Sequence, residues 1–242
     1  MKGTLVIDSL PESAERYRDS YAIVVVDVIR ATTVATTAVS MGRRVFPART
    51  SDEACVIAAT LKEPLLVGEL GGHKPYGFDM TNSPVQITAR TDVHRPMVLV
   101  SSSGTQLLLN AVGSKAVYLA CLRNASAVAR HIDGRHDRVA ILGAGSRGQF
   151  RREDQMGCAW VAAKLLDAGY RAETENTSDL VARWRHAPVE ELRRGKSAEY
   201  LMRSRQQDDL EFVLSHLDDL DTVPSLVGGE LVAAVAESRV PL

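Results

Sequence analysis

Three short apolar runs in this chain are each followed by a cluster of charged, hydroxylated or glycine residues. The runs cover residues 21–26, 96–100 and 138–142, and the clusters cover residues 27–33, 101–105 and 143–154. In an open α/β sheet, ligands bind outside the carboxyl ends of the strands. Carboxylates, arginines, hydroxyls and glycines at three such ends therefore predict one site for a metal ion and a small anion.

Strand-like and helix-like patterns alternate along most of the chain. Short apolar runs typical of buried strands cover 5–7, 23–26, 45–47, 65–67, 97–100, 116–119 and 139–142, with helical stretches at 32–41, 51–61, 105–112, 124–132 and 154–168. From residue 173 the pattern is helical and charged, and 223–229 is expected to form an edge strand or a loop. This order predicts an α/β fold: a three-layer α/β/α sandwich with a mostly parallel or mixed sheet and a helical C-terminal part, in a single domain over residues 1–242.

Composition argues against several classes of protein. The net charge of −1 and the lack of a long run of Lys or Arg argue against binding to nucleic acid. No apolar stretch reaches the ~20 residues of a membrane-spanning helix, and no signal-peptide pattern precedes the first strand. The 3 cysteines are widely spaced and lack a CxxC pair, which is typical of reduced thiols. We therefore expect a cytoplasmic protein with no nucleic-acid or membrane partner.

Asp27 lies at the end of an apolar run that should be buried. A buried carboxylate is costly unless it is paired or bound to a metal ion. Arg30, three residues further along, could make the two side chains a purely structural ion pair. The functional interpretation makes Asp27 a magnesium ligand and Arg30 a clamp for an anion. Thr32 and Thr33 would then open the next helix, where free N–H groups favour an anion.

The segment 68–84 is long and glycine-rich, and it fits neither a helix nor a strand. Long loops in compact domains are often functional. Glu69 and Asp79 supply the carboxylate oxygens that Mg²⁺ prefers, although a loop rich in Gly, Asn and Asp can also be a series of turns. Asn82 and Ser83 are expected either to orient ligand oxygens or to cap the following helix.

A strand-to-helix turn is expected at Ser101, Ser102, Ser103, Gly104 and Thr105. Backbone N–H groups of such turns form anion sites, so this turn is a candidate cradle for phosphate. The alternative is a plain capped turn. It is not a Walker A loop, because no G-K-[ST] follows.

Residues 143–148 match G-x-G-x-x-G after a strand, which is the pattern of a dinucleotide-binding turn. This match makes a nucleotide-dependent oxidoreductase the main alternative function. The match is weakened because the residues that follow it are charged. A dinucleotide-binding helix has a small apolar face there, which packs on the sheet. We interpret the glycines as a loop that brings Arg151, Arg152, Glu153 and Asp154 to the site, where arginine forks bind carboxylate, sulfonate or phosphate.

Taken together, these clusters resemble the 2-phosphosulfolactate phosphatase, or ComB-like, family. The resemblance lies in the order and spacing of residues 27–33, 68–84, 101–105, 121–126 and 152–154. Toward the C-terminus it also includes Ser197, Tyr200, Leu201, Asp208, Asp209, Val223 and Pro224. It covers nearly the whole chain. It implies an α/β/α sandwich and a Mg²⁺-dependent phosphatase that converts 2-phosphosulfolactate into sulfolactate and phosphate, a step of coenzyme M synthesis in methanogens.

The resemblance and the residue patterns together assign roles within the site. The expected catalytic residues are Asp27, Arg30, Glu153 and Asp154, and Mg²⁺ would be held by Asp27 with some of Glu69, Asp79, Glu153 and Asp154. The expected substrate-binding residues are Thr32, Thr33, Asn82, Ser83, Ser101, Ser102, Ser103, Gly104, Thr105, Asn124, Arg151 and Arg152.

The substrate would be a small, phosphorylated anion, and a homodimer is the default oligomer for such enzymes. Two routes stay open for the reaction: direct attack of water on phosphorus, and a covalent phosphoenzyme on Asp27 or on a serine of residues 101–103. A non-catalytic anion-binding protein is a third class of function that the sequence leaves open.

Overall fold

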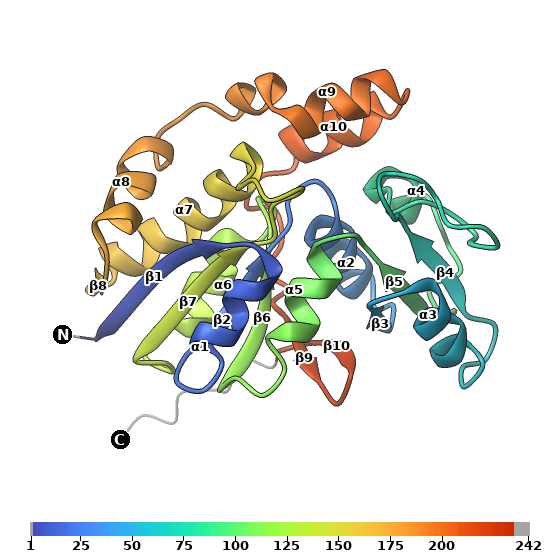
Figure 1. Cartoon of the computed structure of the whole chain (residues 1–242), viewed down its shortest axis with the longest axis horizontal. Helices are drawn as coiled ribbons and strands as arrows, with labels where there is room; N and C mark the ends of the chain where they lie inside the picture. Colours follow the sequence, from blue (N-terminus) through green and yellow to red (C-terminus); the bar gives the residue numbers. More distant parts are fainter. Residues whose placement is uncertain (1, 235–242) are drawn as a thin grey trace.

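The computed structural model of the chain describes residues 2–234 (Figure 1). Its strands are β1 (Gly3–Ser9), β2 (Ala22–Val26), β3 (Val45–Ala48), β4 (Leu65–Gly68), β5 (Met97–Val100), β6 (Ala116–Ala120), β7 (Arg138–Gly143), β8 (Tyr170–Ala172), β9 (Pro224–Val227) and β10 (Glu230–Ala233). Its α-helices are α1 (Ala14–Tyr17), α2 (Ala31–Ser40), α3 (Ser51–Ala58), α4 (Pro84–Thr88), α5 (Gly104–Asn110), α6 (Ala125–Ile132), α7 (Arg152–Asp167), α8 (Glu175–Trp184), α9 (Lys196–Arg203) and α10 (Gln207–Ser215). Two 3₁₀ helices are η1 (Pro11–Ser13) and η2 (Val189–Arg194).

The strands of the described residues form one mixed, 10-stranded sheet in the order β4-β5-β3-β10-β9-β6-β2-β7-β1-β8. Two groups of strands are parallel throughout, β4-β5-β3 and β6-β2-β7-β1-β8. The β9–β10 hairpin pairs antiparallel with β6 on one side and with β3 on the other, and so joins the two groups. The predicted α/β fold with a mostly parallel or mixed sheet is confirmed.

The β9–β10 hairpin corrects one expectation. The sequence pattern predicts an edge strand or a loop at 223–229, but β9 lies inside the sheet, between β6 and β10. Ser225 pairs with Tyr118, and Leu226 pairs with Leu231. Without the hairpin, β3 and β6 would each leave a row of backbone groups unpaired, and the hairpin covers both rows. The prediction is wrong because local sequence does not reveal these unpaired edges.

Helices cover both faces of the sheet (Figure 1). Helices α6, α7 and α8 pack on one face of the β6-β2-β7-β1-β8 group, against side chains such as Leu5, Val24 and Ile141. Helices α1, α2 and α5 pack on the opposite face, against Val6 and Ile23. Helices α2 and α5 also contact strands of the β4-β5-β3 group, whose other face is covered by α3. The helical C-terminal part consists of α8, η2, α9 and α10, and no helix within residues 2–234 is long and apolar enough to cross a membrane.

Helix α7 brings two acidic residues close to strand β2. Its first turn contains Glu153 and Asp154, at the positive end of the helix dipole. One turn later, Gly157 faces the sheet: a Cβ atom there would lie 2.9 Å from Val26 Cγ1 and 2.9 Å from Val28 Cγ2. The glycine therefore allows α7 to lie close to β2, which places the first turn of α7 beside the loop that follows β2.

We expect Gly157→Ala to lower the free energy of unfolding, measured by urea denaturation. The added methyl group costs about 1–3 kcal/mol by overpacking the contact with β2, and roughly 1 kcal/mol of gained helix propensity offsets only part of this. Asp167→Ala, at the exposed end of the same helix, is the control and should change stability by less than about 0.5 kcal/mol. A Gly157→Ala protein as stable as the wild type would contradict the close packing.

Candidate active site

A cavity of about 530 Å³ lies where the segments after β2, β4, β5 and β7 meet helix α9. Its carboxylates are Asp27, Glu69, Glu153, Asp154 and Glu199, and its cations are Arg30, Arg147, Arg151, Lys196 and Arg203. Its lining also includes Asn82, Ser102, Ser103, Ser197 and Tyr200. The structure thus brings four of the five predicted metal ligands to one cavity, which is the arrangement that a site for a metal ion and an anion requires.

Asp27 is the first residue after β2 and is only 8% exposed. The N–H of Ala31, at the start of α2, donates to Asp27 Oδ1 at 3.2 Å. Gly104, the first residue of α5, packs against the same carboxylate, and a Cβ atom at that position would collide with Asp27 Oδ2. The turn after β5 is therefore held directly against Asp27, in a position that only glycine allows.

The pKa of Asp27 is raised to about 7, chiefly by burial. The negative charges of Glu69 and Glu153 act in the same direction, while the N–H of Ala31 and the charge of Arg30 oppose the rise in pKa. A carboxyl group that titrates near neutral pH and lines a cavity is a candidate functional group.

Glu153 and Asp154 are both buried, but they differ in how their oxygens are used. Burial raises the pKa of both carboxyl groups, and the charge of Asp27 contributes to the rise for Asp154. Asp154 accepts backbone N–H groups on both oxygens, from Val28 at 2.9 Å and from Gly145 at 2.9 Å. Glu153 Oε2, in contrast, has no hydrogen-bond partner among the described residues. Asp154 therefore ties the loops after β2 and β7 together, whereas Glu153 keeps an unsatisfied oxygen.

Glu69 connects the loop after β4 to the turn after β5. Its Oε1 accepts from Ser102 N–H at 2.8 Å, and its Oε2 accepts from the Ser102 hydroxyl at 3.0 Å and from Gly72 N–H at 2.7 Å. The N–H of Gly71 in turn donates to Ser102 Oγ at 2.7 Å. Glu69 and Ser102 therefore fix each other at the cavity wall.

Among residues 2–234, no group of three or more His, Cys, Asp or Glu side chains is arranged to hold a metal ion by itself. A smaller donor set nevertheless fits Mg²⁺, which commonly binds one or two carboxylates together with water and substrate phosphate oxygens. Asp27 and Glu153 supply two buried carboxyl groups with raised pKa values, and one of their oxygens is unsatisfied within the described chain. A cation between them would offset the cost of burying both charges, and for Asp27 it would also relieve the repulsion by Glu69 and Glu153 that contributes to its raised pKa.

The turn after β5 divides into residues that shape it and residues that line the cavity. Ser101 Oγ accepts the N–H of Gly104 at 2.8 Å, and Thr105 Oγ1 donates to the carbonyl of Ser101 at 2.9 Å. Both hydroxyls are used within the turn itself. Ser102 and Ser103 line the cavity, so they are the members of this turn that a bound anion would meet.

Thr32 and Thr33 also turn their hydroxyls to their own loop. Thr32 Oγ1 donates to the carbonyl of Asp27 at 2.9 Å, and Thr33 Oγ1 donates to the carbonyl of Val28 at 2.7 Å. These two predicted phosphate ligands therefore stabilise the connection between β2 and α2 rather than line the cavity.

The structure places four further predicted site residues outside the cavity: Asp79, Ser83, Asn124 and Arg152. Asp79 accepts a backbone N–H of β4 at 2.8 Å. Asn124 is buried, accepts the N–H of Cys121 at 2.9 Å and donates to the carbonyl of Thr222 at 3.0 Å. Ser83 caps α4, which is one of its two predicted roles. Arg152 Nη1 lies 3.4 Å from Oε2 of Glu191 in η2. In each case a nearby protein group contacts the side chain, and these four residues do not line the cavity.

Helix α9 forms a wall of the cavity that the sequence patterns did not assign. Lys196, Ser197, Tyr200 and Arg203 all line the cavity, and the Tyr200 hydroxyl donates to the carbonyl of Gly72 in the loop after β4. A charged helix of this kind usually indicates a solvated face. The one available signal was the presence of Ser197 and Tyr200 in the family resemblance.

The glycine loop contributes Gly145, Ser146 and Arg147 to the cavity. It does not have the features of a dinucleotide-binding turn, because the N–H of Gly145 is occupied by Asp154. Helix α7 begins only at Arg152, and a pyrophosphate at its N-terminus would meet buried carboxylates instead of free N–H groups. This geometry disfavours the oxidoreductase alternative.

In the presence of a chelator, we expect Asp27→Asn to raise the melting temperature at pH 8. The pKa of Asp27 is raised from 3.8 to about 7, so between these values the folded chain holds a proton that the unfolded chain has lost, and stability falls as pH rises. At pH 8 the full penalty of the buried charge is present. The variant should then gain at least about 1 kcal/mol, or roughly 2–4 °C.

The gain should shrink as the pH is lowered toward 5, because the wild-type carboxyl then becomes neutral in the folded state. Asp167→Asn, at the exposed end of α7, is the control and should show no comparable gain. A wild-type protein that is as stable as Asp27→Asn at pH 8 without metal would contradict the raised pKa.

Comparisons with known proteins show which family the chain resembles. The family model of 2-phosphosulpholactate phosphatase matches residues 7–229. A probable 2-phosphosulfolactate phosphatase of Deinococcus radiodurans is 32% identical over 238 residues, which cover 96% of this chain and 97% of that protein. Proteins with the same name from Parasynechococcus marenigrum (32% over 213 residues, 84% of this chain and 88% of that protein) and Symbiobacterium thermophilum (33% over 217 residues, 86% and 92%) are also similar. The chain belongs to the 2-phosphosulfolactate phosphatase family.

Proposed function

We propose that this protein is a Mg²⁺-dependent phosphatase that hydrolyses 2-phosphosulfolactate, or a related phosphorylated hydroxy acid, to sulfolactate and phosphate. Membership of the family supports the class of reaction. The observation that carries the proposal is the single cavity in which Asp27, Glu69 and Glu153 meet a serine turn and several cations.

Asp27 and Glu153 would hold Mg²⁺, with water and a phosphate oxygen completing its coordination. When bound, the ion would neutralise charge on the transferring phosphoryl group and activate the attacking water. Both carboxyl groups have raised pKa values, so a nearby cation would favour their ionised forms. Glu69 would help to keep the turn after β5 in place through its bonds to Ser102.

The turn after β5 would bind the phosphoryl group. Ser102 and Ser103 line the cavity, and Gly104 packs directly against Asp27, so a phosphoryl group bound at this turn lies beside the proposed metal ligand. Ser103 is the N-cap of α5 and its side chain makes no capping bond. Ser101 Oγ accepts the N–H groups of Gly104 and Thr105, at 2.8 and 3.3 Å, so the Ser103 hydroxyl is the group at this end of the helix that would donate to the phosphoryl group. Positioning and electrostatic stabilisation of this kind can carry most of a phosphoryl transfer.

The cations of the cavity would bind the other acidic groups of the substrate. Arg147, Arg151, Lys196 and Arg203 line the cavity from the glycine loop and from α9. Arg151 Nε is buried and has no hydrogen-bond partner among residues 2–234, so this donor is available to a ligand. Guanidinium groups bind carboxylates and sulfonates through paired N–H donors, which suits a substrate that carries both groups beside its phosphate.

Purified protein is expected to release phosphate from 2-phosphosulfolactate in the presence of Mg²⁺. The release of phosphate should stop in excess chelator. Asp27→Asn should lower kcat by at least ~100-fold, because it removes a group that stabilises charge in the transition state. Asp79→Asn is the matched control: it neutralises another predicted ligand, but one that lies outside the cavity, and should change kcat by less than about threefold.

Undiminished turnover in chelator would refute the role of the metal ion, and full activity of Asp27→Asn would refute the site. Turnover that is confined to other phosphate esters would keep the reaction class and reject the proposed substrate. Tight binding of a nicotinamide or flavin cofactor, measured by fluorescence titration, would favour the oxidoreductase alternative.

A further inference from the structure

Arg30 and Asp209 form a buried ion pair at the edge of the cavity. Arg30 is 4% exposed and Asp209, in the first turn of α10, is 3% exposed. The two residues are 179 positions apart in the chain. A buried ion pair often contributes no more stability than well-packed apolar residues would, because the cost of desolvation offsets the attraction. Stability alone therefore gives a weak reason for this pair.

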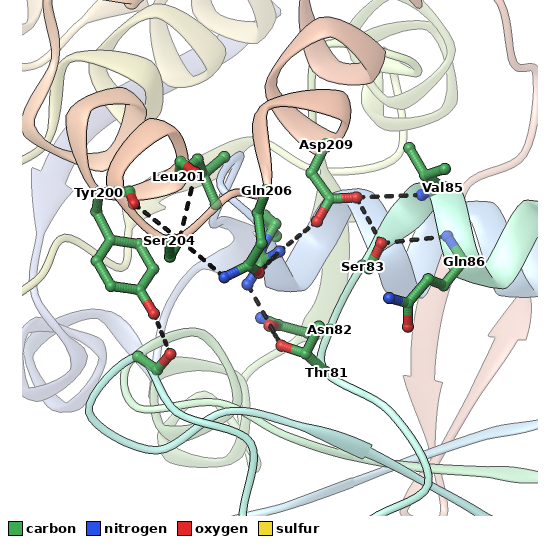
Figure 2. Close-up of polar contacts among 12 residues, drawn as sticks. Thr81, Asn82, Ser83, Val85, Gln86, Tyr200, Leu201, Ser204, Gln206 and Asp209 are labelled. Carbon is green, nitrogen blue, oxygen red and sulfur yellow. Dashed lines mark hydrogen bonds and ion pairs between the residues drawn. The ribbon is translucent and has the colours of Figure 1, made fainter.

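Asp209 is fixed through both of its oxygens (Figure 2). Oδ2 accepts from Arg30 Nη1, while Oδ1 accepts from the Ser83 hydroxyl and, at 3.4 Å, from Val85 N–H. Ser83 Oγ in turn accepts the N–H of Gln86 in α4 at 3.1 Å. The Asp209 carboxylate is thus held between α10 and the start of α4 and cannot rotate without losing these bonds.

Arg30 is held mainly through one of its terminal nitrogens. Nη1 donates to both Asp209 and Gln206, whereas Nη2 makes a long contact of 3.4 Å to the Thr81 hydroxyl. A guanidinium group has five N–H donors, so three remain beyond the two of Nη1. Arg30 also lines the cavity that a substrate would enter.

Asp27 is a second carboxylate near Arg30. Asp27 lies three residues earlier in the same loop and is close enough for the charge of Arg30 to lower its pKa. If Asp209 were neutral, Arg30 would be free to move toward Asp27 and pair with it. That pair would occupy both the carboxylate that the metal ion needs and the guanidinium group that the anion needs.

We propose that Asp209, assisted by Gln206, is a positioning residue that holds Arg30 away from Asp27 and leaves its free N–H donors for an anionic group of the substrate. The inference rests on the proposed function and adds to it a role for helix α10, which carries Asp209. Asp209 does not itself line the cavity, so it acts through Arg30 and not by contact with the substrate.

A double-mutant cycle on the full chain tests this role, with kcat/KM for 2-phosphosulfolactate measured in Mg²⁺. Asp209→Asn, which removes the charge with little change in shape, should lower kcat/KM by about 10–100-fold. In an Arg30→Gln background the same substitution should have less than about a threefold effect, because the residue through which it acts is gone. Equal losses in both backgrounds, or no loss in the wild-type background, would overturn the inference.

Asp219→Asn is the matched control. It removes the charge from a second Arg–Asp pair, in which Asp219 contacts Arg123 at 2.6 Å, and neither residue lines the cavity. The control should change kcat/KM by less than about threefold even if it lowers the melting temperature. A comparable loss of kcat/KM in the control would show that any broken ion pair impairs the enzyme, and would overturn the specific role of Asp209.

Binding of inorganic phosphate, measured by isothermal titration in Mg²⁺, separates this inference from the proposed function. Asp209→Asn should weaken phosphate binding by about tenfold in the wild-type background and leave it unchanged in Arg30→Gln. A wild type that binds phosphate without turning over the substrate would refute the proposed function. The double-mutant cycle measured by phosphate binding would still decide the role of Asp209.

If Asp209→Asn does not fold, Gln206→Ala replaces it in the cycle, with a smaller expected loss of about 3–10-fold. Equal losses in both Arg30 backgrounds would overturn the inference.

Discussion

Two hydrogen bonds of Asp154 determine the geometry on which the candidate site depends. The carboxylate accepts the N–H of Val28 and the N–H of Gly145, at 2.9 Å each, so one side chain joins α7 to the loops after β2 and β7. Asp27 directly precedes Val28, and Glu153 directly precedes Asp154. The same two bonds therefore bring both proposed metal ligands together, although they come from segments more than a hundred residues apart in the chain.

This convergence has an energetic cost that the rest of the fold must offset. Burial raises the pKa values of Asp27, Glu153 and Asp154, which means that the folded state favours their neutral forms. At neutral pH the ionised groups weaken the fold, and a bound cation would reverse this effect. The close packing of α7 on β2 at Gly157 holds the acidic turn in place despite the repulsion. Functional sites commonly keep such locally unfavourable groups where the surrounding core is well packed.

The strands and the polar clusters at their ends could be predicted from sequence, because runs such as 22–26 are apolar and β-branched and then change abruptly in polarity. The order of the strands could not, since pairing depends on contacts between distant segments, as the insertion of β9 and β10 illustrates. Several of the predicted site residues that do not line the cavity carry hydroxyl groups. Thr32 and Ser101 use their hydroxyls within their own turns, and the same residue at the same position can serve either a turn or a ligand. The pairing of Arg30 with Asp209 in place of Asp27 likewise depends on where α10 lies.

The charges of the cavity would connect the binding of the proposed metal ion to the binding of an anionic substrate. Five carboxylates (Asp27, Glu69, Glu153, Asp154 and Glu199) and five cations (Arg30, Arg147, Arg151, Lys196 and Arg203) line it, so its formal net charge is zero. With every one of these groups ionised, the lining has no strong attraction for the proposed substrate, which carries phosphate, carboxylate and sulfonate groups together. Mg²⁺ would make the cavity positive, and a bound phosphate would in turn supply oxygens to the ion. Each would then raise the affinity for the other, because a coupling free energy between two ligands is reciprocal.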